Sequence, residues 1–122
     1  MITICIPDTP PSNNEFLGKN KRFQYATAKQ HWEKMVYAYG RNLKPDKPYH
    51  HATVHIHYTF PDKRRRDPDN YSGKMLLDPL TKLGIIRDDN FGAIRLELSA
   101  ESEKGKRETR ITITEGIDGK VS

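Results

Sequence analysis

The sequence predicts a small α+β domain, in which two helices pack on a mixed sheet. Apolar and polar side chains alternate, as is typical of half-buried strands, in residues 2–6, 51–60, 93–100 and 108–114. Apolar side chains recur near the helical period in residues 28–43 and 69–83. The chain has 122 residues, a length that suits one compact domain.

The first half of the chain reads as a strand, a loop and a helix. Prolines end the strand 2–6, and residues 15–25 have the character of an irregular loop. Thr27 is placed to cap the helix 28–43, and Lys44-Pro45 ends it. The apolar stripe of this helix comprises Trp32, Met35, Val36, Tyr39 and Leu43.

The clearest strand is 51–60, whose polar face carries His55 and His57. With no partner carboxylate in the neighbouring sequence, these histidines are interpreted as solvent-facing or interface residues. The helix 69–83 follows, with Gly84 just past its end. Pro79 removes one backbone donor inside that helix, which predicts a kink or a new first turn capped by Asp78.

Two strands complete the domain. Ile85-Ile86 is predicted to form a short extended piece, and Gly105 to join strands 93–100 and 108–114 as a hairpin. The resulting order is β-α-β-α-β-β. We expect residues 1–115 to form the domain and residues 116–122 to form a flexible tail.

The chain is basic, with 21 Lys and Arg against 16 Asp and Glu and a net charge of +5. This balance favours a polyanionic partner such as nucleic acid. The single cysteine, Cys5, excludes an intrachain disulfide framework and a multi-cysteine zinc site. The sequence contains no signal-peptide pattern and no apolar run long enough for a membrane helix, so we expect a cytoplasmic protein without a membrane partner.

A group of carboxylates follows the basic run 63–66. Asp67 and Asp69 are two positions apart, and extended backbone would point both side chains the same way. Asp88-Asp89, returned by the next helix, would complete a set of oxygen ligands of the kind that Mg²⁺ prefers. Lys74, about one turn past Asn70, would lean toward a bound phosphate. The alternative is structural: Asp67 as a helix N-cap before a proline, and Asp88-Asp89 as a turn.

In combination, these residues resemble the RusA family of Holliday junction resolvases, small endodeoxyribonucleases often carried by phages and prophages. The matching stretches are residues 63–70 (KRRRDPDN), 77–84 (LDPLTKLG) and 88–89, with 10–14 (PPSNN) and 111–115 (ITITE) near the two ends. The resemblance therefore spans nearly the whole chain.

The resemblance implies an α+β homodimer that makes paired nicks in four-way DNA junctions during recombination and repair. It implies Mg²⁺ as the cofactor, with Mn²⁺ as a substitute, and no organic cofactor. The essential aspartates of the family correspond to Asp67, Asp69 and Asp89, with Asp88 as a neighbour that orients or shares the ion. The essential lysine corresponds to Lys74.

One departure from the family pattern concerns Lys74. It lies five positions past Asp69, one more than in the family. On a regular helix the extra residue rotates the side chain by about 100°, which a bulge or a later helix start would absorb.

The DNA-binding residues are expected to be basic or amide side chains that hold phosphates by a sequence-independent attraction. They are Lys63, Arg64, Arg65, Arg66, Lys19, Lys21, Arg22, Asn13 and Asn14. We also expect the two asparagines to approach the carboxylates.

A dimer also follows from the expected reaction, because two sites related by a two-fold axis match the pseudo-symmetry of a four-way junction. Two alternatives stay open. One is a nuclease of the same chemistry that prefers flaps or forks, and the other is a catalytically weak or inactive module that binds junctions.

Overall fold

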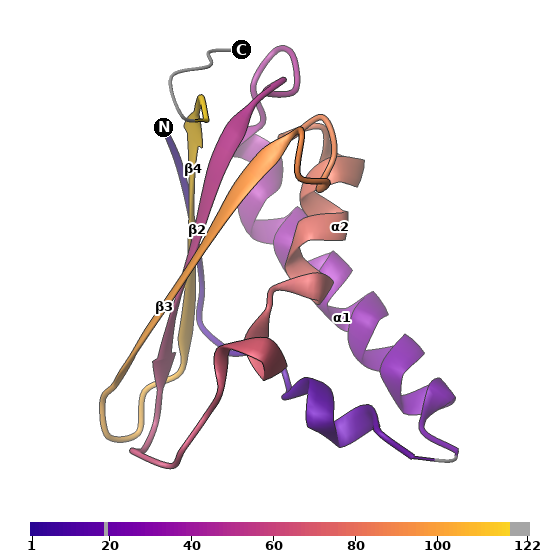
Figure 1. Ribbon diagram of the computed structural model, residues 1–122, viewed down its shortest axis with the longest axis vertical. Coiled ribbons are helices and arrows are strands. Elements are labelled where there is room, and N and C mark those ends of the chain that lie inside the picture. Colours follow the sequence, from indigo (N-terminus) through magenta and orange to yellow (C-terminus); the bar gives the residue numbers. More distant parts are fainter. Residues whose placement is uncertain (19, 118–122) are drawn as a thin grey trace.

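The computed structural model describes residues 1–18 and 20–117, which form a four-stranded sheet with both long helices on one face (Figure 1). The strands are β1 (Ile2–Ile6), β2 (Ala52–Phe60), β3 (Ile94–Ser102) and β4 (Glu108–Glu115). The helices are α1 (Arg22–Gly40) and α2 (Lys74–Leu83), with short 3-10 turns η1 (Asn13–Phe16), η2 (Arg41–Leu43) and η3 (Pro68–Tyr71). The α+β class and the predicted element order are confirmed.

The sheet is mixed, with the strand order β1-β4-β2-β3. β2 and β3 run parallel, whereas β4 is antiparallel to both of its neighbours. Parallel strands need a crossover connection, and η3 and α2 supply it. As a result, the residues after β2 and the residues before β3 lie at opposite ends of the sheet.

The predicted hairpin between β3 and β4 is wrong, because β2 lies between these strands. A tight turn with Gly105 at φ +75° does exist. It carries the chain across the end of β2: the Glu103 N–H donates to the Phe60 carbonyl at 2.9 Å, and the Gly105 N–H to that of Pro61 at 3.2 Å. A sequence pattern that fits a turn does not reveal whether the flanking strands pair with each other.

α1 begins earlier than predicted, inside the segment interpreted as a loop. Thr27 therefore does not cap it; its hydroxyl donates to the Phe23 carbonyl one turn back, at 3.0 Å. The buried positions are Trp32, Val36 and Gly40, whereas Tyr39 and Leu43 of the predicted stripe are exposed. The helix ends at Gly40, and Leu43 belongs to the 3-10 turn η2.

The single helix predicted over residues 69–83 is divided in two. Gly73 has φ +84° and separates η3 from α2, so Lys74 is the first residue of the longer helix. α2 runs without interruption through Pro79, and Asp78 forms ion pairs with Lys29 and Lys82 instead of capping a new turn. Gly84 ends the helix at φ +85°, as predicted.

The hydrophobic core lies between the helices and the inner face of the sheet. Its central members come from β1, β2, β4 and both helices: Ile4, Ile6, Val54, Ile56, Ile111, Ile113, Val36, Leu76 and Leu80 are fully buried, as are Ile85 and Ile86 after α2. Ile86 makes an isolated parallel bridge to Tyr49, where a short extended piece was expected. Among the described residues, no helix has the length and apolar character needed to cross a bilayer.

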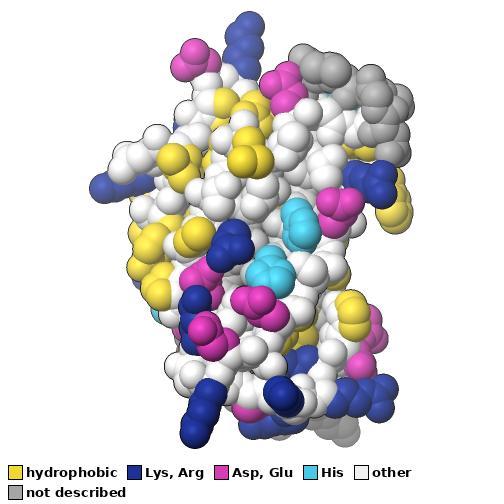
Figure 2. Space-filling view, turned by 90° about the vertical axis from the view of Figure 1, so that its left-hand side faces the viewer, with side chains coloured by type: hydrophobic (Ala, Val, Ile, Leu, Met, Phe, Trp, Pro, Cys, Tyr) yellow, Lys and Arg dark blue, Asp and Glu magenta, His cyan; other side chains and the backbone are white. Residues whose placement is uncertain are grey.

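The other face of the sheet carries mostly polar and charged side chains, which are visible in the space-filling view (Figure 2). Most of the predicted tail, residues 118–122, lies outside the described residues. Gly116, its first residue, donates a hydrogen bond to the His51 carbonyl at 2.8 Å and accepts one from Thr53 at 2.9 Å.

Candidate functional site

The basic run 63–66 lies in the loop that follows β2, and Asp62 organises this loop. The Asp62 carboxylate accepts the Arg64 N–H at 2.9 Å and pairs with the Arg66 guanidinium at 2.9 Å. These bonds, that of the Arg64 N–H first, lower the pKa of Asp62 below its usual value. Sequence reasoning missed Asp62, although a Pro-Asp pair before a basic run is a common turn signal.

The four basic side chains of this loop have two different roles. The Arg66 side chain is only 13% exposed, donates to the carbonyls of Asp62 and Arg64, and lies over the Phe60 ring at 4.4 Å. It therefore holds the loop together. Arg64 and Arg65 are 78% and 88% exposed, and Lys63 is exposed as well, so these three present positive charge to solvent.

Asp67 occupies the N-cap position of η3 before Pro68, but its side chain makes no capping hydrogen bond. Instead, Arg65 Nε contacts its Oδ1 at 3.2 Å, and the carboxylate is about half exposed. The capping interpretation therefore does not account for this side chain. An exchangeable arginine partner leaves the carboxylate open to another cation.

Asp69 lies in the first turn of η3 and is exposed. The prediction that extended backbone aligns it with Asp67 is wrong, because only Asp67 is extended and Asp69 is in the 3-10 turn. Within the described part of the chain the Asp69 carboxylate makes no ion pair. Its backbone carbonyl accepts a bond from Asn13 Nδ2 at 3.3 Å, so the predicted approach of Asn13 to this segment is observed.

Lys74 is exposed at the start of α2, and its Nζ lies 5.6 Å from the centre of the Tyr25 ring. The left-handed Gly73 begins this helix late, which is one of the two ways expected to absorb the extra residue before Lys74. Lys74, Asn13, Lys21 and Arg22 line one open groove of about 440 Å³. Lys19, predicted to join them, lies outside the described residues.

A larger open groove of about 1030 Å³ is also lined by residues of η1 and shares Phe16 with the first groove. Its lining combines aromatic, proline and arginine side chains with Asp67, Asn14 and Asn70. Arg107, from the turn before β4, also reaches this groove and bonds the Thr9 hydroxyl at 3.3 Å. Sequence reasoning did not assign Arg107 to the site, since only the pairing of β4 with β1 brings it there.

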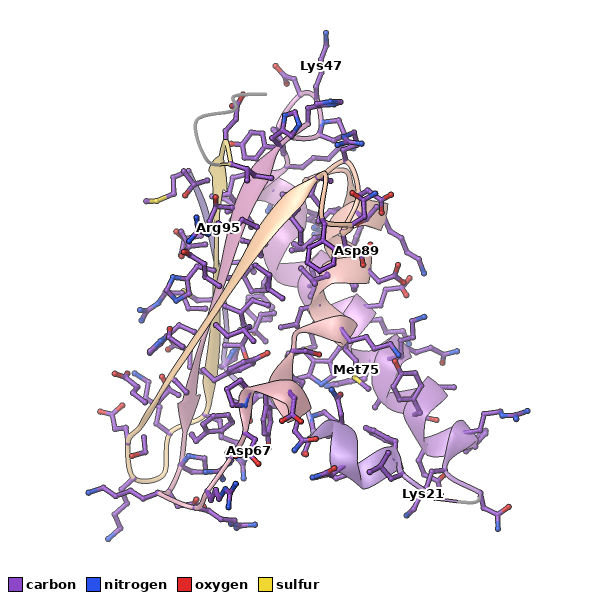
Figure 3. All side chains as sticks on the ribbon, viewed as in Figure 1. Lys21, Lys47, Asp67, Met75, Asp89 and Arg95 are labelled. Atoms are coloured by element: carbon purple, nitrogen blue, oxygen red, sulfur yellow. The ribbon has the colours of Figure 1, made fainter. Side chains whose placement is uncertain are left out.

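Asp88 and Asp89 lie in the loop before β3, and Asp89 is far from Asp67 (Figure 3). The Asp88 carboxylate accepts the Asp89 N–H at 2.8 Å and the Asn90 amide at 3.1 Å, so it shapes its own loop. Asp89 is exposed, and the described residues offer its carboxylate no ion pair.

A single chain therefore does not assemble the three predicted ligands. No group of three or more His, Cys, Asp or Glu side chains among residues 1–18 and 20–117 is arranged to hold a metal ion. The cause is topological: Asp67 follows β2, Asp89 precedes β3, and these strands are parallel.

A second polar cluster lies on the open face of the sheet. The Ser99 hydroxyl lies 2.7 Å from His55 Nε2 and 2.6 Å from His57 Nδ1. Glu101 approaches His57 Nε2 at 3.7 Å, so the partner carboxylate that the sequence did not reveal comes from the neighbouring strand. The space-filling view shows two histidines side by side on this face, with acidic side chains beside them (Figure 2).

Comparison with known proteins adds no assignment. No model of a known protein family matches the chain, and no curated protein matches it in sequence. What is established is a small α+β domain with a mixed four-stranded sheet and two helices.

Proposed function

We propose that this protein is a Mg²⁺-dependent endodeoxyribonuclease that makes paired nicks in four-way DNA junctions as a homodimer. The observation that carries the proposal is the position of Asp67 and Asp69. Asp69 lies in the turn η3 and Asp67 precedes it without capping it. Basic side chains line the large groove that includes Asp67, and a second groove that includes Lys74. Carboxylates in such surroundings would repel phosphate unless a cation lay between them.

The residues present fit a hard divalent cation. Mg²⁺ in phosphate-processing sites is usually held by one or two carboxylates together with water and substrate phosphate, and Asp67 and Asp69 supply two carboxylates. Arg65, now paired with Asp67, is 88% exposed and free to turn toward DNA. When bound, the ion would lower the pKa of a water molecule and so supply a hydroxide nucleophile at neutral pH.

The other roles belong to basic side chains. Lys74 would bind the scissile phosphate and stabilise the charge that develops on its oxygens. Asn13 would fix η3 beside this lysine, because it bonds the Asp69 carbonyl and lines the groove of Lys74. Lys63, Arg64, Arg65, Lys21 and Arg22 would hold flanking phosphates.

The third carboxylate, Asp89, would come from the second copy in the dimer. Because Asp67 and Asp89 lie at opposite ends of one sheet, a two-fold related copy is the simplest source of a third ligand. Each of the two sites would then contain Asp67 and Asp69 of one chain and Asp89 of the other.

The first test is Asp69→Asn, with Asp46→Asn as the control of equal charge change on an exposed loop. A labelled mobile junction and a linear duplex are incubated with each protein in Mg²⁺ and in EDTA. We expect the parent and Asp46→Asn to nick only the junction, only in Mg²⁺, and Asp69→Asn to bind without nicking. Binding without nicks by the parent, in Mn²⁺ as well, would favour the inactive-module alternative. Faster nicking of flaps or forks in a substrate panel would favour the other alternative.

A second test separates shared sites from sites within one chain. Asp69→Asn and Asp89→Asn are inactive alone, and the two proteins are then mixed and allowed to exchange subunits. If the sites are shared, one site of each mixed dimer is intact and the junction receives a single nick. If each site lies within one chain, both sites stay damaged and the mixture makes no nicks.

A further inference from the structure

β3 forms one edge of the sheet, and no strand among the described residues pairs with its outer side. β3 is nine residues long and lies at the end of the strand order, whereas the opposite edge strand β1 has five residues and is followed by Pro7. β3 contains no proline, which is one of the usual devices that protect an edge strand from pairing.

The hydrogen bonds to β2 show which backbone groups of β3 are unused. The Ala52 N–H donates to the Ala93 carbonyl at 3.0 Å, and the Glu103 N–H to the Phe60 carbonyl at 2.9 Å. In a parallel ladder with these two bonds at its ends, alternate residues of β3 bond to β2. The remaining residues direct backbone groups to the free edge. Leu96, Leu98, Ala100 and Ser102 direct both N–H and C=O there, whereas the Ile94 N–H donates to the Asn90 carbonyl at 3.0 Å, so Ile94 offers only its C=O.

Apolar side chains accompany this edge on the helix side of the sheet. Leu96 is 36% exposed, Leu98 is partly buried and Ala100 is exposed. Phe91, in the loop just before β3, is fully exposed. An edge with unpaired backbone groups and exposed leucines is a typical template for strand addition.

The charge pattern of β3 is complementary to that of a second, antiparallel β3 strand. Arg95, Glu97, Ser99 and Glu101 point to the open face in alternation with the apolar residues. Within one chain Arg95 pairs with Glu97 at 3.6 Å, and Glu101 lies 3.7 Å from His57 Nε2. A second copy would exchange or share these surface contacts, which are weak in water. In an antiparallel pair of two β3 strands with Leu98 opposite Leu98, Arg95 of each copy faces Glu101 of the other. Slipping this alignment by one residue pair in one direction puts Glu97 opposite Glu97, and in the other direction it puts Glu97 opposite Glu101, so like charges meet.

We propose that a second copy of this chain pairs with β3 edge to edge, antiparallel, with Leu98 on the two-fold axis. This alignment uses the whole strand, because Ile94 then faces Ser102 of the second copy. It pairs the N–H and C=O groups that Leu96, Leu98 and Ala100 direct to the edge, and it joins the two sheets into one of eight strands. An alignment centred on Leu96 also avoids like charges, by pairing Arg95 with Glu97, but it leaves the end of each strand unpaired.

The pairing has a consequence for the carboxylates, which rests on the proposed function. Antiparallel strands bring the start of one β3 beside the end of the other. Asp67 lies beside the second half of β3, since it lines a small apolar pocket with Leu98, Ser99 and Ala100. The loop that carries the second copy's Asp89 precedes its β3 and so reaches the end of the sheet where Asp67 lies. Figure 3 shows that, within one chain, Asp67 and Asp89 lie toward opposite ends of the sheet.

The test is a charge exchange between copies, measured by sedimentation equilibrium over a range of protein concentrations. We expect the parent to be a dimer. Arg95→Glu and Glu101→Arg should each dimerise about tenfold more weakly or worse, because both put like charges together at two symmetric positions. An equimolar mixture of the two variants should recover dimers, since each mixed pair restores both opposite-charge contacts. Damage within one chain cannot be repaired by mixing.

A proline at Ala100 tests whether backbone hydrogen bonds at the free edge of β3 hold the two copies together. Ala100→Pro removes an N–H group at the free edge without removing a bond to β2, and Ala100→Ser is its matched control. Ala100→Pro should fold with near-parental circular dichroism and lose dimers, whereas Ala100→Ser should keep them.

Four results would overturn the proposal: a monomeric parent, parental dimerisation of both charge variants, failure of their mixture to recover dimers, or rescue of Arg95→Glu by Glu97→Arg instead of Glu101→Arg. The nicking assay tests the nuclease proposal independently of these dimerisation measurements. A dimer through β3 that never nicks junctions would support the interface and refute the nuclease. Nicking by a monomer would support nuclease activity and refute both the interface and the shared site.

Discussion

Replacing Gly73 by alanine tests the left-handed connection between η3, which carries Asp69, and α2, which begins at Lys74. Gly73 has φ +84°, a conformation that L side chains rarely adopt. Its missing side chain also makes room for the core, because a Cβ atom there would lie well inside van der Waals contact with Cδ1 of Ile56. Ile56 is fully buried in the centre of β2, so it has little freedom to move away.

The expected loss of stability has two parts. The left-handed backbone costs about 1–2 kcal/mol for a residue with a Cβ atom. Overpacking in a filled core costs about 1–3 kcal/mol more. The sum, about 2–5 kcal/mol, is a large share of the roughly 5–15 kcal/mol that stabilises a typical domain. The variant should still fold, with a much lower Tm.

Gly105→Ala is the matched control. Gly105 has φ +75°, but an added Cβ atom would meet nothing within 4 Å, so only the backbone cost of about 1–2 kcal/mol applies. Urea unfolding followed by circular dichroism measures both variants. We expect Gly73→Ala to lose about 1–3 kcal/mol more than Gly105→Ala. Equal losses would refute the close approach of Gly73 to Ile56, and with it the tight connection between η3 and α2.

Three further predictions concern the loop after β2 and its support. If Arg64 and Arg65 each contact a phosphate, replacing both by alanine lowers the slope of log affinity against log salt by about 2, whereas Lys47→Ala, at the far end of the molecule, leaves the slope unchanged. Asp62 has a lowered pKa in the folded protein, so its contribution to stability is complete above the unfolded pKa of about 3.9 and is lost as the pH falls through the folded value. The difference in free energy of unfolding between the parent and Asp62→Asn should therefore be constant at neutral pH and vanish in acid; a difference that persists in acid contradicts the ion pair with Arg66. The buried Tyr58 hydroxyl donates to the Tyr71 carbonyl at 2.8 Å, so Tyr58→Phe should cost about 1–3 kcal/mol, measured by thermal unfolding, by leaving that carbonyl unpaired.

Local patterns predicted the elements well where one side of each element is buried. The alternation in β2 and β4 matches the buried positions Val54, Ile56, Ile111 and Ile113, because a strand with one covered face must alternate. The same reasoning weakened at β3, whose Leu96 and Leu98 face the helix layer at an edge that the described residues leave partly open. The start of α1 was missed because its first turns bury few side chains, and an apolar stripe marks only the buried part of a helix.

The sequence identified the residue types of the candidate site but not their grouping. Asp67, Asp69 and Lys74 are close along the chain, so their neighbourhood on η3 and α2 follows from local structure. Asn13 and Arg107 reach the same region only because distant segments pack there. The separation of Asp89 from Asp67 depends on the parallel pairing of β2 with β3, a property of the whole sheet.

The sequence alone determined the α+β class, the element order and the basic, carboxylate-bearing loop after β2. These features depend on side-chain periodicity, turn residues and charge, which short stretches of sequence determine. The tertiary structure decided the strand order, the division of the second helix at Gly73 and the distance between the aspartates. Those features depend on which strands pair, and pairing is fixed by the joint burial of residues far apart in sequence.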